Sequence, residues 1–483
     1  MASARPANLP PAKALTVAAA VLAMVAVLWL TGRRPVDPTY RGRTATQWLA
    51  ELRSPSGGYD MTQVSQALAA IGPQATNALL RHLTRPRFLP APAVHWLGSR
   101  ANSPWLLELA SRREGARELA LLGLQWCGAD PAALVPDLLT AMDRYAEPQQ
   151  SRRVNALLVR AGPAALEPIL NWASQAGPDR AAIALEAAGL LLAPGQNPPW
   201  AEADLESPLR KLLGQTNTIV RSATLSAVRA GGGRAAALAD AVVAAGQLQP
   251  VTPEIEWAAA GCLGGMAAHP AVAVPALAAW AGSSHEMVRG KALLSLAAFG
   301  PEAAPALRTV VHSLSHPAPS IRLPAVNVLS RIGPAAAGTA EPLIERLHDA
   351  EPIIRSGAAR ALGRIGAPPD RAVPALAAAL GDPAPDVRRH AAEALGELGP
   401  GAALAVPELT KLLRDGEIPV RLAAIGALGR IGPGARAAVP ELHAARNNDQ
   451  SGVGRPVLEA LARIEGAAPP AVGGWDAGAA AGR

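Results

Sequence analysis

Six arginines recur at a nearly constant interval in the second half of this 483-residue chain. They are Arg289, Arg322, Arg355, Arg388, Arg421 and Arg455, so the first four steps are identical and the last is one residue longer. A guanidinium group binds a carboxylate or a phosphate through two parallel hydrogen bonds. The row therefore predicts either an ion-pair ladder within the fold or a surface that binds an anionic partner.

Aspartates accompany three of these arginines, each six residues earlier in the chain. The predicted structural ladder consists of Asp349 and Arg355, Asp382 and Arg388, and Asp415 and Arg421. Charge pairing and turn capping explain these residues without any ligand, since an exposed pair contributes only about 0–1 kcal/mol.

Arg289 and Arg322 break this pattern, because Ser283 and His316 stand where the aspartates would be. We therefore expect both arginines to lack an ionic partner, and they are the candidate residues for binding a partner's carboxylate or phosphate. The alternative is that other acids, such as Glu286 or Glu302, already neutralise them.

Other reactive motifs are missing from the sequence. It contains no phosphate-binding Gly-rich loop ending in Lys-Ser or Lys-Thr, no His-Glu-x-x-His, no Cys-x-x-Cys and no Gly-x-Ser-x-Gly. His312 and His316 are four residues apart on a predicted helix, and we interpret them as ordinary polar residues near a helix end. Cys127 and Cys262 lie too far apart in sequence to indicate a disulfide. We predict no catalytic residue, no metal site and no cofactor.

The arginines belong to repeating helix pairs, of which residues 373–400 are one example. A first apolar helix ends near Leu380, and the prolines that follow break it. Asp386 is the expected N-cap of a second helix with one apolar face, and Gly399 ends that helix. Glycines recur with the same period at Gly300, Gly333, Gly366, Gly399, Gly432 and Gly466. One helix pair cannot bury its apolar face alone, so we expect the pairs to stack into a continuous core.

The spacing of three residue types resembles that of the HEAT-repeat family, including its bacterial HEAT-like branch. Pro374, Asp382 and Arg388 are separated by steps of eight and six, and Pro407, Asp415 and Arg421 repeat the spacing. The resemblance implies an all-α fold, an α-solenoid of about thirteen helix pairs, in which the proline bends the first helix and the Asp and Arg residues form a ladder. Deoxyhypusine hydroxylases and bilin lyases share such repeats. The former hold two irons with several His-Glu pairs, whereas this sequence offers one at His285–Glu286, and nothing in it points to a bilin.

The N-terminal region contains a candidate membrane anchor. Ala14 to Leu30 is apolar except for one threonine, and its length of roughly 25 Å lies at the low end for a membrane helix. Arg33-Arg34 follows in place of a small-residue cleavage site, which favours an uncleaved anchor over a signal peptide. The positive-inside rule favours a cytoplasmic repeat domain, whereas a short basic tail that stays inside favours the opposite. We expect a single-pass membrane protein with its repeats on the extracytoplasmic side.

The expected segments follow from these features. They are a tail at 1–13, the transmembrane anchor at 14–31, a linker at 32–43, degenerate repeats at 44–267, regular repeats at 268–466 and a disordered tail at 467–483. Residues 40–52 resemble the opening helix of membrane-anchored bacterial HEAT-repeat proteins, and Trp48 would cover the exposed end of the first repeat. Further tryptophans concentrate in the irregular half, where they either fill gaps between imperfect repeats or form a recognition surface.

Composition sets the remaining limits on function. The net charge of +7 is small for 483 residues, whereas a nucleic-acid binder more often concentrates its charge in one stripe. We predict a membrane-anchored scaffold that binds an unidentified protein partner and carries out no catalysis. The alternatives are a HEAT-like enzyme or enzyme accessory of the lyase or hydroxylase type, and a binder of nucleic acid or anionic surfaces.

Overall fold

The computed structural model describes residues 39–45, 47–48, 61–84, 120–121, 124, 130–142, 148–193, 205–267, 269–447 and 453–466. The chain divides into two compact units, Met1–Leu157 and Leu158–Arg483. The predicted membrane anchor, Cys127 and the C-terminal tail lie outside the described residues. Among the helices that are described, none is long and apolar enough to cross a membrane.

The first unit opens with a small antiparallel hairpin followed by helices. Its elements are β1 (Thr39–Tyr40), β2 (Arg43–Thr44), α3 (Met61–Ile71), the 3-10 turn η1 (Gly72–Ala75), α4 (Thr76–Thr84), η2 (Ala132–Leu134), α7 (Val135–Met142) and α8 (Pro148–Arg160), within which the division between the units falls.

The hairpin corrects the helix predicted from Tyr40. Arg41 and Gly42 both have positive φ, so the chain turns there and Tyr40 pairs with Arg43. Helical structure starts only at Ala45, where Thr44 and Gln47 satisfy each other's backbone N–H groups at 3.2 and 2.8 Å. Trp48, which we predict to cover the exposed end of the first repeat, is 9% exposed, and its Nε1 donates to the Tyr40 carbonyl at 3.1 Å.

The second unit is built from consecutive helix pairs. The first helices of the pairs are α9 (Leu166–Ala173), α11 (Glu206–Leu213), α13 (Ala239–Gln247), α15 (Pro270–Ala281), α17 (Leu307–Ser313), α19 (Ala340–Arg346), α21 (Pro369–Ala379), α23 (Val406–Lys411) and α25 (Val439–Asn447). The second helices are α10 (Pro178–Leu192), α12 (Thr218–Gly231), α14 (Pro253–Met266), α16 (Glu286–Leu296), α18 (Pro319–Ile332), α20 (Pro352–Arg364), α22 (Pro385–Leu398), α24 (Ile418–Ile431) and α26 (Gly454–Glu465). Short 3-10 segments join them at η3 (Gly162–Ala165), η4 (Gly232–Leu238), η5 (Ala297–Ala306), η6 (Gly333–Thr339), η7 (Gly399–Ala405), η8 (Leu412–Arg414) and η9 (Gly432–Ala438).

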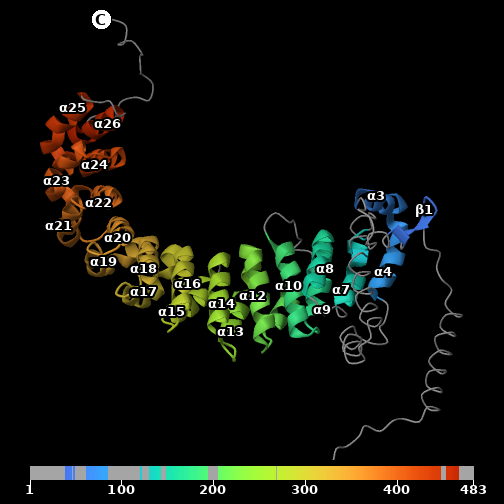
Figure 1. Ribbon diagram of the computed structural model, residues 1–483. Helices are drawn as coiled ribbons and strands as arrows, with labels where there is room; N and C mark the ends of the chain where they lie inside the picture. Colours follow the sequence, from blue (N-terminus) through green and yellow to red (C-terminus); the bar gives the residue numbers. More distant parts are fainter. Residues whose placement is uncertain are drawn as a thin grey trace, which may run out of the picture. The chain divides into compact units, whose positions relative to one another are not determined.

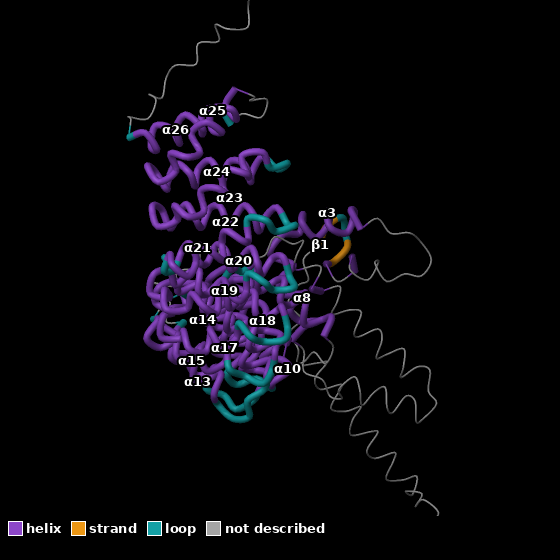
Figure 2. Tube along the Cα trace, turned by 90° about the vertical axis from the view of Figure 1, so that its left-hand side faces the viewer, coloured by secondary structure: helices purple, strands orange, loops and turns teal. Residues whose placement is uncertain are grey.

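Successive pairs stack side by side, so each kind of helix forms its own row (Figure 1). Within the second unit, the row of second helices lies on the inner side of the curve and the row of first helices on the outer side. Figure 2 shows the stack from another side, with α22, α24 and α26 following one another. This arrangement confirms the predicted α-solenoid. The total of about thirteen pairs stays a prediction, because several stretches before residue 205 lie outside the described residues.

The unit at residues 369–399 shows how sequence produces this geometry. As predicted, α21 ends next to Leu380, and Val387, Ala391 and Leu395 of α22 are buried. The predicted cap is wrong: Ala384 is the N-cap of α22, and Pro385 and Asp386 follow within the first turn. Proline suits that position because its missing N–H would have no helical partner there.

The recurring glycines follow the second helices, and Gly399 ends α22 as expected. All six have positive φ, between 56° and 75°, a conformation that side chains with a Cβ rarely adopt. The chain can therefore reverse direction after each second helix and enter the next pair.

Candidate partner-binding site on the inner helices

A ladder of Asp and Arg side chains is present, but three of its arginines pair with the aspartate of the following repeat. The Nε and Nη2 atoms of the arginine donate to both carboxylate oxygens of an aspartate 27 residues later, at 2.7–3.0 Å. The pairs are Arg322 with Asp349, Arg355 with Asp382, and Arg388 with Asp415. Their side chains are only 3–17% exposed, so these are buried two-point ion pairs that join neighbouring repeats.

Each aspartate also stabilises the turn within its own repeat. Asp415 Oδ1 accepts the Glu417 backbone N–H at 3.0 Å, and Arg421 Nη1 donates to the Asp415 carbonyl at 2.7 Å. The hydrogen bond from Arg388 holds the pKa of the Asp415 carboxyl below its ordinary value. For Asp382, burial raises the pKa, but the hydrogen bond from Arg355 and other favourable contacts outweigh it, so its pKa is also lowered.

This pairing between neighbouring repeats corrects the expectation that Arg322 lacks a carboxylate partner. Arg322 is paired with Asp349, and the serine or histidine six residues before an arginine does not determine that arginine's ionic partner. Arg289 is the arginine that lacks a partner aspartate, because His316 occupies the aspartate position in the repeat that follows it. Arg289 donates twice to the Ser283 carbonyl, at 3.2 and 2.8 Å, and has no ion pair among the described residues. His316 Nδ1 instead accepts the Ala318 N–H at 3.1 Å, as the aspartates do in their own turns.

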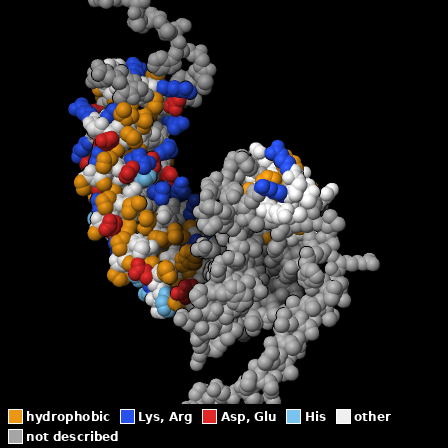
Figure 3. Space-filling view, turned by 45° about the vertical axis from the view of Figure 1, so that its right-hand side comes forward, with side chains coloured by type: hydrophobic (Ala, Val, Ile, Leu, Met, Phe, Trp, Pro, Cys, Tyr) orange, Lys and Arg blue, Asp and Glu red, His pale blue; other side chains and the backbone are white. Residues whose placement is uncertain are grey.

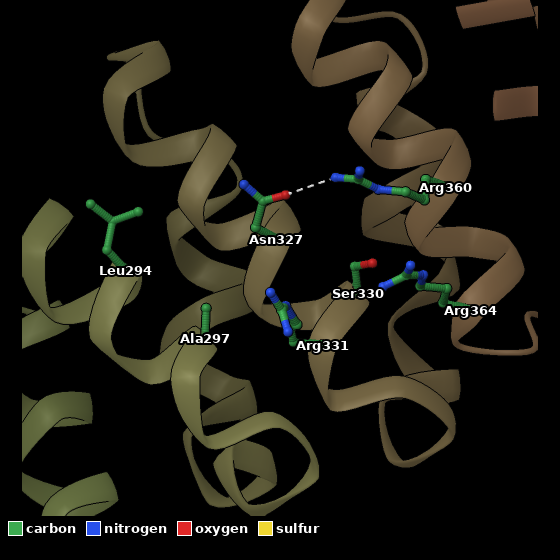
Figure 4. Close-up of a pocket in the computed structure, with 7 residues that line it drawn as sticks. All are labelled: Leu294, Ala297, Asn327, Ser330, Arg331, Arg360 and Arg364. Carbon is green, nitrogen blue, oxygen red and sulfur yellow. Dashed lines mark hydrogen bonds between the residues drawn. The ribbon is translucent and has the colours of Figure 1, made fainter. Parts of the chain in front are cut away.

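The inner row contains a second set of arginines, which form a pocket. A cavity of about 470 Å³ lies between α16, α18 and α20 and is lined by Leu294, Ala297, Asn327, Ser330, Arg331, Arg360 and Arg364. In Figure 4, Arg360 and Arg364 extend from α20 toward α18, and Arg331 lies near Ala297. We call this cavity the arginine pocket. None of its lining residues is acidic.

The arginine pocket occurs where a row of glycines is interrupted. Gly363, Gly396 and Gly429 each face the next second helix so closely that a Cβ would lie 2.8–2.9 Å from a backbone Cα. Ala297 and Ser330 occupy the equivalent positions in the two preceding repeats. Because their side chains exclude such a close approach, space remains beside them.

A second hollow of about 280 Å³ adjoins the arginine pocket and shares Asn327 and Arg360 with it. The charge of Arg389 in this hollow is compensated, because Arg389 bonds Asp386 at 2.9 Å and Glu393 at 3.2 Å. His390 lies 2.6 Å from the Ser356 hydroxyl, and burial lowers the pKa of its imidazole. Leu323 and Ile353 give this hollow its apolar surface, so we call it the apolar hollow.

One tryptophan lies beside cations on the second-helix row. Arg229 and Lys291 stand over the Trp257 ring, with their charged atoms 5.7 and 5.5 Å from its centre. Trp257 is partly exposed, whereas Trp280 is buried. Trp280 thus fills the space beside Gly246, and part of Trp257 remains exposed.

The described residues considered for enzyme chemistry do not form a metal site. Among the described residues, no group of three His, Cys, Asp or Glu side chains could hold a metal ion. Cys262 is buried and its Sγ donates to the Leu225 carbonyl at 2.9 Å. Burial raises the pKa of this thiol to about 12, so it stays protonated near neutral pH.

The sequence reasoning missed the arginine pocket, although two signals for it are present. Arg331 and Arg364 stand exactly one repeat apart, and so do Ala297 and Ser330, which replace the glycine of other repeats. The prediction instead named Arg289 and Arg322, because it considered only the periodic arginines of the ladder.

Comparison with known proteins supports the repeat type. Residues 340–416 match the family model described as HEAT repeats, and residues 405–435 match the model described as HEAT repeat. No curated protein sequence matches the chain. Among solved structures, an engineered protein is 20% identical with a TM-score of 0.45, covering 87% of this chain and 98% of its own. Importin beta is 17% identical with a TM-score of 0.44, covering 87% of this chain and 61% of its own.

Proposed function

We propose that this HEAT-repeat α-solenoid is a scaffold that binds an extended segment of another protein along its second-helix row. The observation that carries the proposal is the pair of adjoining hollows between α16 and α22. They share Asn327 and Arg360 and are lined by both apolar and hydrogen-bonding side chains. Leu294 and Ile353 at these hollows are 56% and 61% exposed. Exposed apolar side chains next to unpaired arginines are typical of protein-binding surfaces.

Site-specific crosslinking tests this proposal. A photoreactive amino acid introduced at Leu294 should crosslink the partner, whereas the same group at Leu404 should not. Leu404 is also strongly exposed, at 84%, but belongs to the η7 connection. The crosslinked protein is identified in native cells and then tested with purified components. Equal crosslinking from both positions, or binding that survives blocking of the inner hollows, would contradict the proposed surface.

The features of the solenoid favour binding over catalysis. Three of its ladder arginines, Arg322, Arg355 and Arg388, are engaged in ion pairs within the fold, and the described thiol is buried and protonated. On the face of the second unit that Figure 3 shows, charges of both signs are interspersed with exposed apolar patches. This pattern suits a protein partner better than the uniform phosphate backbone of a nucleic acid.

We further propose that residues 14–31 anchor the scaffold in a membrane, with the repeats on the extracytoplasmic side. The support is the apolar run from Ala14 to Leu30 and the adjacent Arg33-Arg34. Fractionation of native cells should recover the intact chain with the membrane, and protease added outside should digest the repeats. A soluble mature chain that starts after residue 30 would contradict the anchor.

A further inference from the structure

We infer that the partner segment is acidic and that one of its carboxylates binds in the arginine pocket. This inference rests on the proposed function and adds the chemistry of the ligand. It concerns Arg331, Arg360 and Arg364, which the ladder does not use.

The first argument is unmatched positive charge. Arg331 and Arg364 are exposed and make no hydrogen bond or ion pair that involves the described residues. Arg360 donates from Nη2 to Asn327 at 3.2 Å, but its Nε is buried without a partner. The charge of Glu397 interacts with Arg364, but Glu397 does not line the pocket. A buried donor among three guanidinium groups is satisfied by an anion with oxygen acceptors.

The second argument is the apolar surface on both sides of the charge. Leu294 borders the arginine pocket, and Leu323 and Ile353 line the apolar hollow one repeat further along. A peptide segment can present a carboxylate and an apolar side chain at these two places. Single-stranded nucleic acids require aromatic stacking surfaces, and no aromatic residue lines either hollow apart from the His390 ring, which bonds Ser356. The surroundings of the arginines therefore favour an acidic peptide over a nucleic acid.

The third argument is the distribution of charge along the row. On one side, Trp257 lies beneath Arg229 of α12 and Lys291 of α16, which offers a second contact for an acidic or aromatic residue. On the other side, α22 carries Glu393 and Glu397. Glu393 is bonded by Arg389, and Glu397 would repel a negatively charged segment. The acidic part of the ligand thus lies against α12 to α20 and ends before α22.

Selection of peptides by the full-length chain in detergent tests the inference. A library of short random peptides is panned against three proteins: the natural chain, the pocket variant Arg331→Ser with Arg364→Ser, and the control variant Arg308→Ser with Arg414→Ser. All four arginines are exposed, so both variants should fold, and they carry the same net charge. Circular dichroism melting checks that the fold is retained.

The inference predicts that the natural chain and the control variant select peptides rich in Asp and Glu next to an apolar residue. The pocket variant should lose this preference, and isolated acidic peptides should bind it at least about tenfold more weakly. Selection of peptides without an acidic preference, or equal binding by both variants, overturns the acidic ligand while the scaffold proposal stands. If the natural chain selects no peptide at all, both proposals fail. Tighter binding of a single-stranded oligonucleotide that depends on Arg331 and Arg364 would assign the pocket to nucleic acid instead.

Discussion

Two stretches of the second-helix row differ in how closely their helices pack. From α20 to α26, Gly363, Gly396 and Gly429 allow each helix to contact the backbone of the next. From α16 to α20, Ala297 and Ser330 take the same positions and the arginine pocket lies beside them. Both stretches keep the ladder on α18, α20 and α22. A change of one small side chain per repeat therefore separates a closed interface from an open one, without altering the repeat itself.

The comparison first predicts that the two stretches share an equivalent core. Leu329 and Leu395 stand two repeats apart, and both are 0% exposed. Leu329→Ala and Leu395→Ala should each lower the free energy of unfolding by about 2–5 kcal/mol, because each leaves a cavity. Chemical denaturation of the whole chain measures both. A loss below about 0.5 kcal/mol for Leu329→Ala alone would show that the open stretch is loosely packed throughout.

The second prediction concerns the ladder that both stretches share. Asp415→Asn keeps an acceptor for the turn but leaves the Arg388 guanidinium, itself largely buried, without its charge partner. We expect a loss of about 3 kcal/mol in the free energy of unfolding, at the lower end for a broken buried pair. Glu417 in the same turn is exposed, so Glu417→Gln should change the free energy of unfolding by less than about 0.5 kcal/mol. Equal effects from both changes would mean that the pair contributes nothing specific.

The pH dependence of that loss follows from the direction of the Asp415 shift. The folded pKa is lowered from the ordinary value of 3.8, so the unfolded chain binds a proton more readily. The contribution of Asp415 is complete above the unfolded pKa and disappears as the pH falls through the folded one. The difference between the natural chain and Asp415→Asn should thus be constant near neutral pH and shrink only below about pH 4. A difference that vanishes between pH 5 and 7 would contradict this cause.

The third and smallest effect tests the glycine contacts directly, within one helix. A Cβ on Gly429 would lie 2.9 Å from the Ala460 Cα, whereas a Cβ on Gly426 would meet nothing within 4 Å. Gly429→Ala should therefore lower the unfolding free energy by about 1–3 kcal/mol. Gly426→Ala should raise it by about 0.5–1 kcal/mol, since glycine weakens a helix interior. Thermal melting distinguishes the two, and stabilisation by both would show that α24 and α26 can separate freely.

Sequence periodicity predicted the helix pairs because burial repeats with the same period as the residues. Val387 and Leu395 fall on the inside for that reason, and Gly399 ends its helix because the backbone there requires positive φ. Periodicity could not predict which aspartate pairs with which arginine of the ladder. An aspartate shortly before one arginine also follows the arginine of the preceding repeat, and only the lateral spacing of neighbouring repeats selects the second pairing.

The arginine pocket could not be predicted from the sequence for a different reason. Its presence depends on how far apart two second helices lie, and this distance is set by the smallest side chains between them. Ala297 and Ser330 are conservative replacements for glycine by composition, but each adds the Cβ atom that prevents backbone contact. The pattern of apolar residues is the same whether glycine, alanine or serine occupies these positions, so it does not reveal the difference.

The ladder's register also determines how this chain could change its length. Removing residues 356–388 would delete Asp382 together with Arg388, and Arg355 would then stand at the ladder's own separation from Asp415. Inserting one whole unit has the converse result, since each new arginine meets an aspartate that came with the neighbouring copy. Duplication or loss of a repeat therefore leaves no unpaired charge at the junction. An insertion of another length that shifts the helices between an arginine and its aspartate would break a buried ion pair, so whole repeats are the steps in which the ladder can lengthen or shorten.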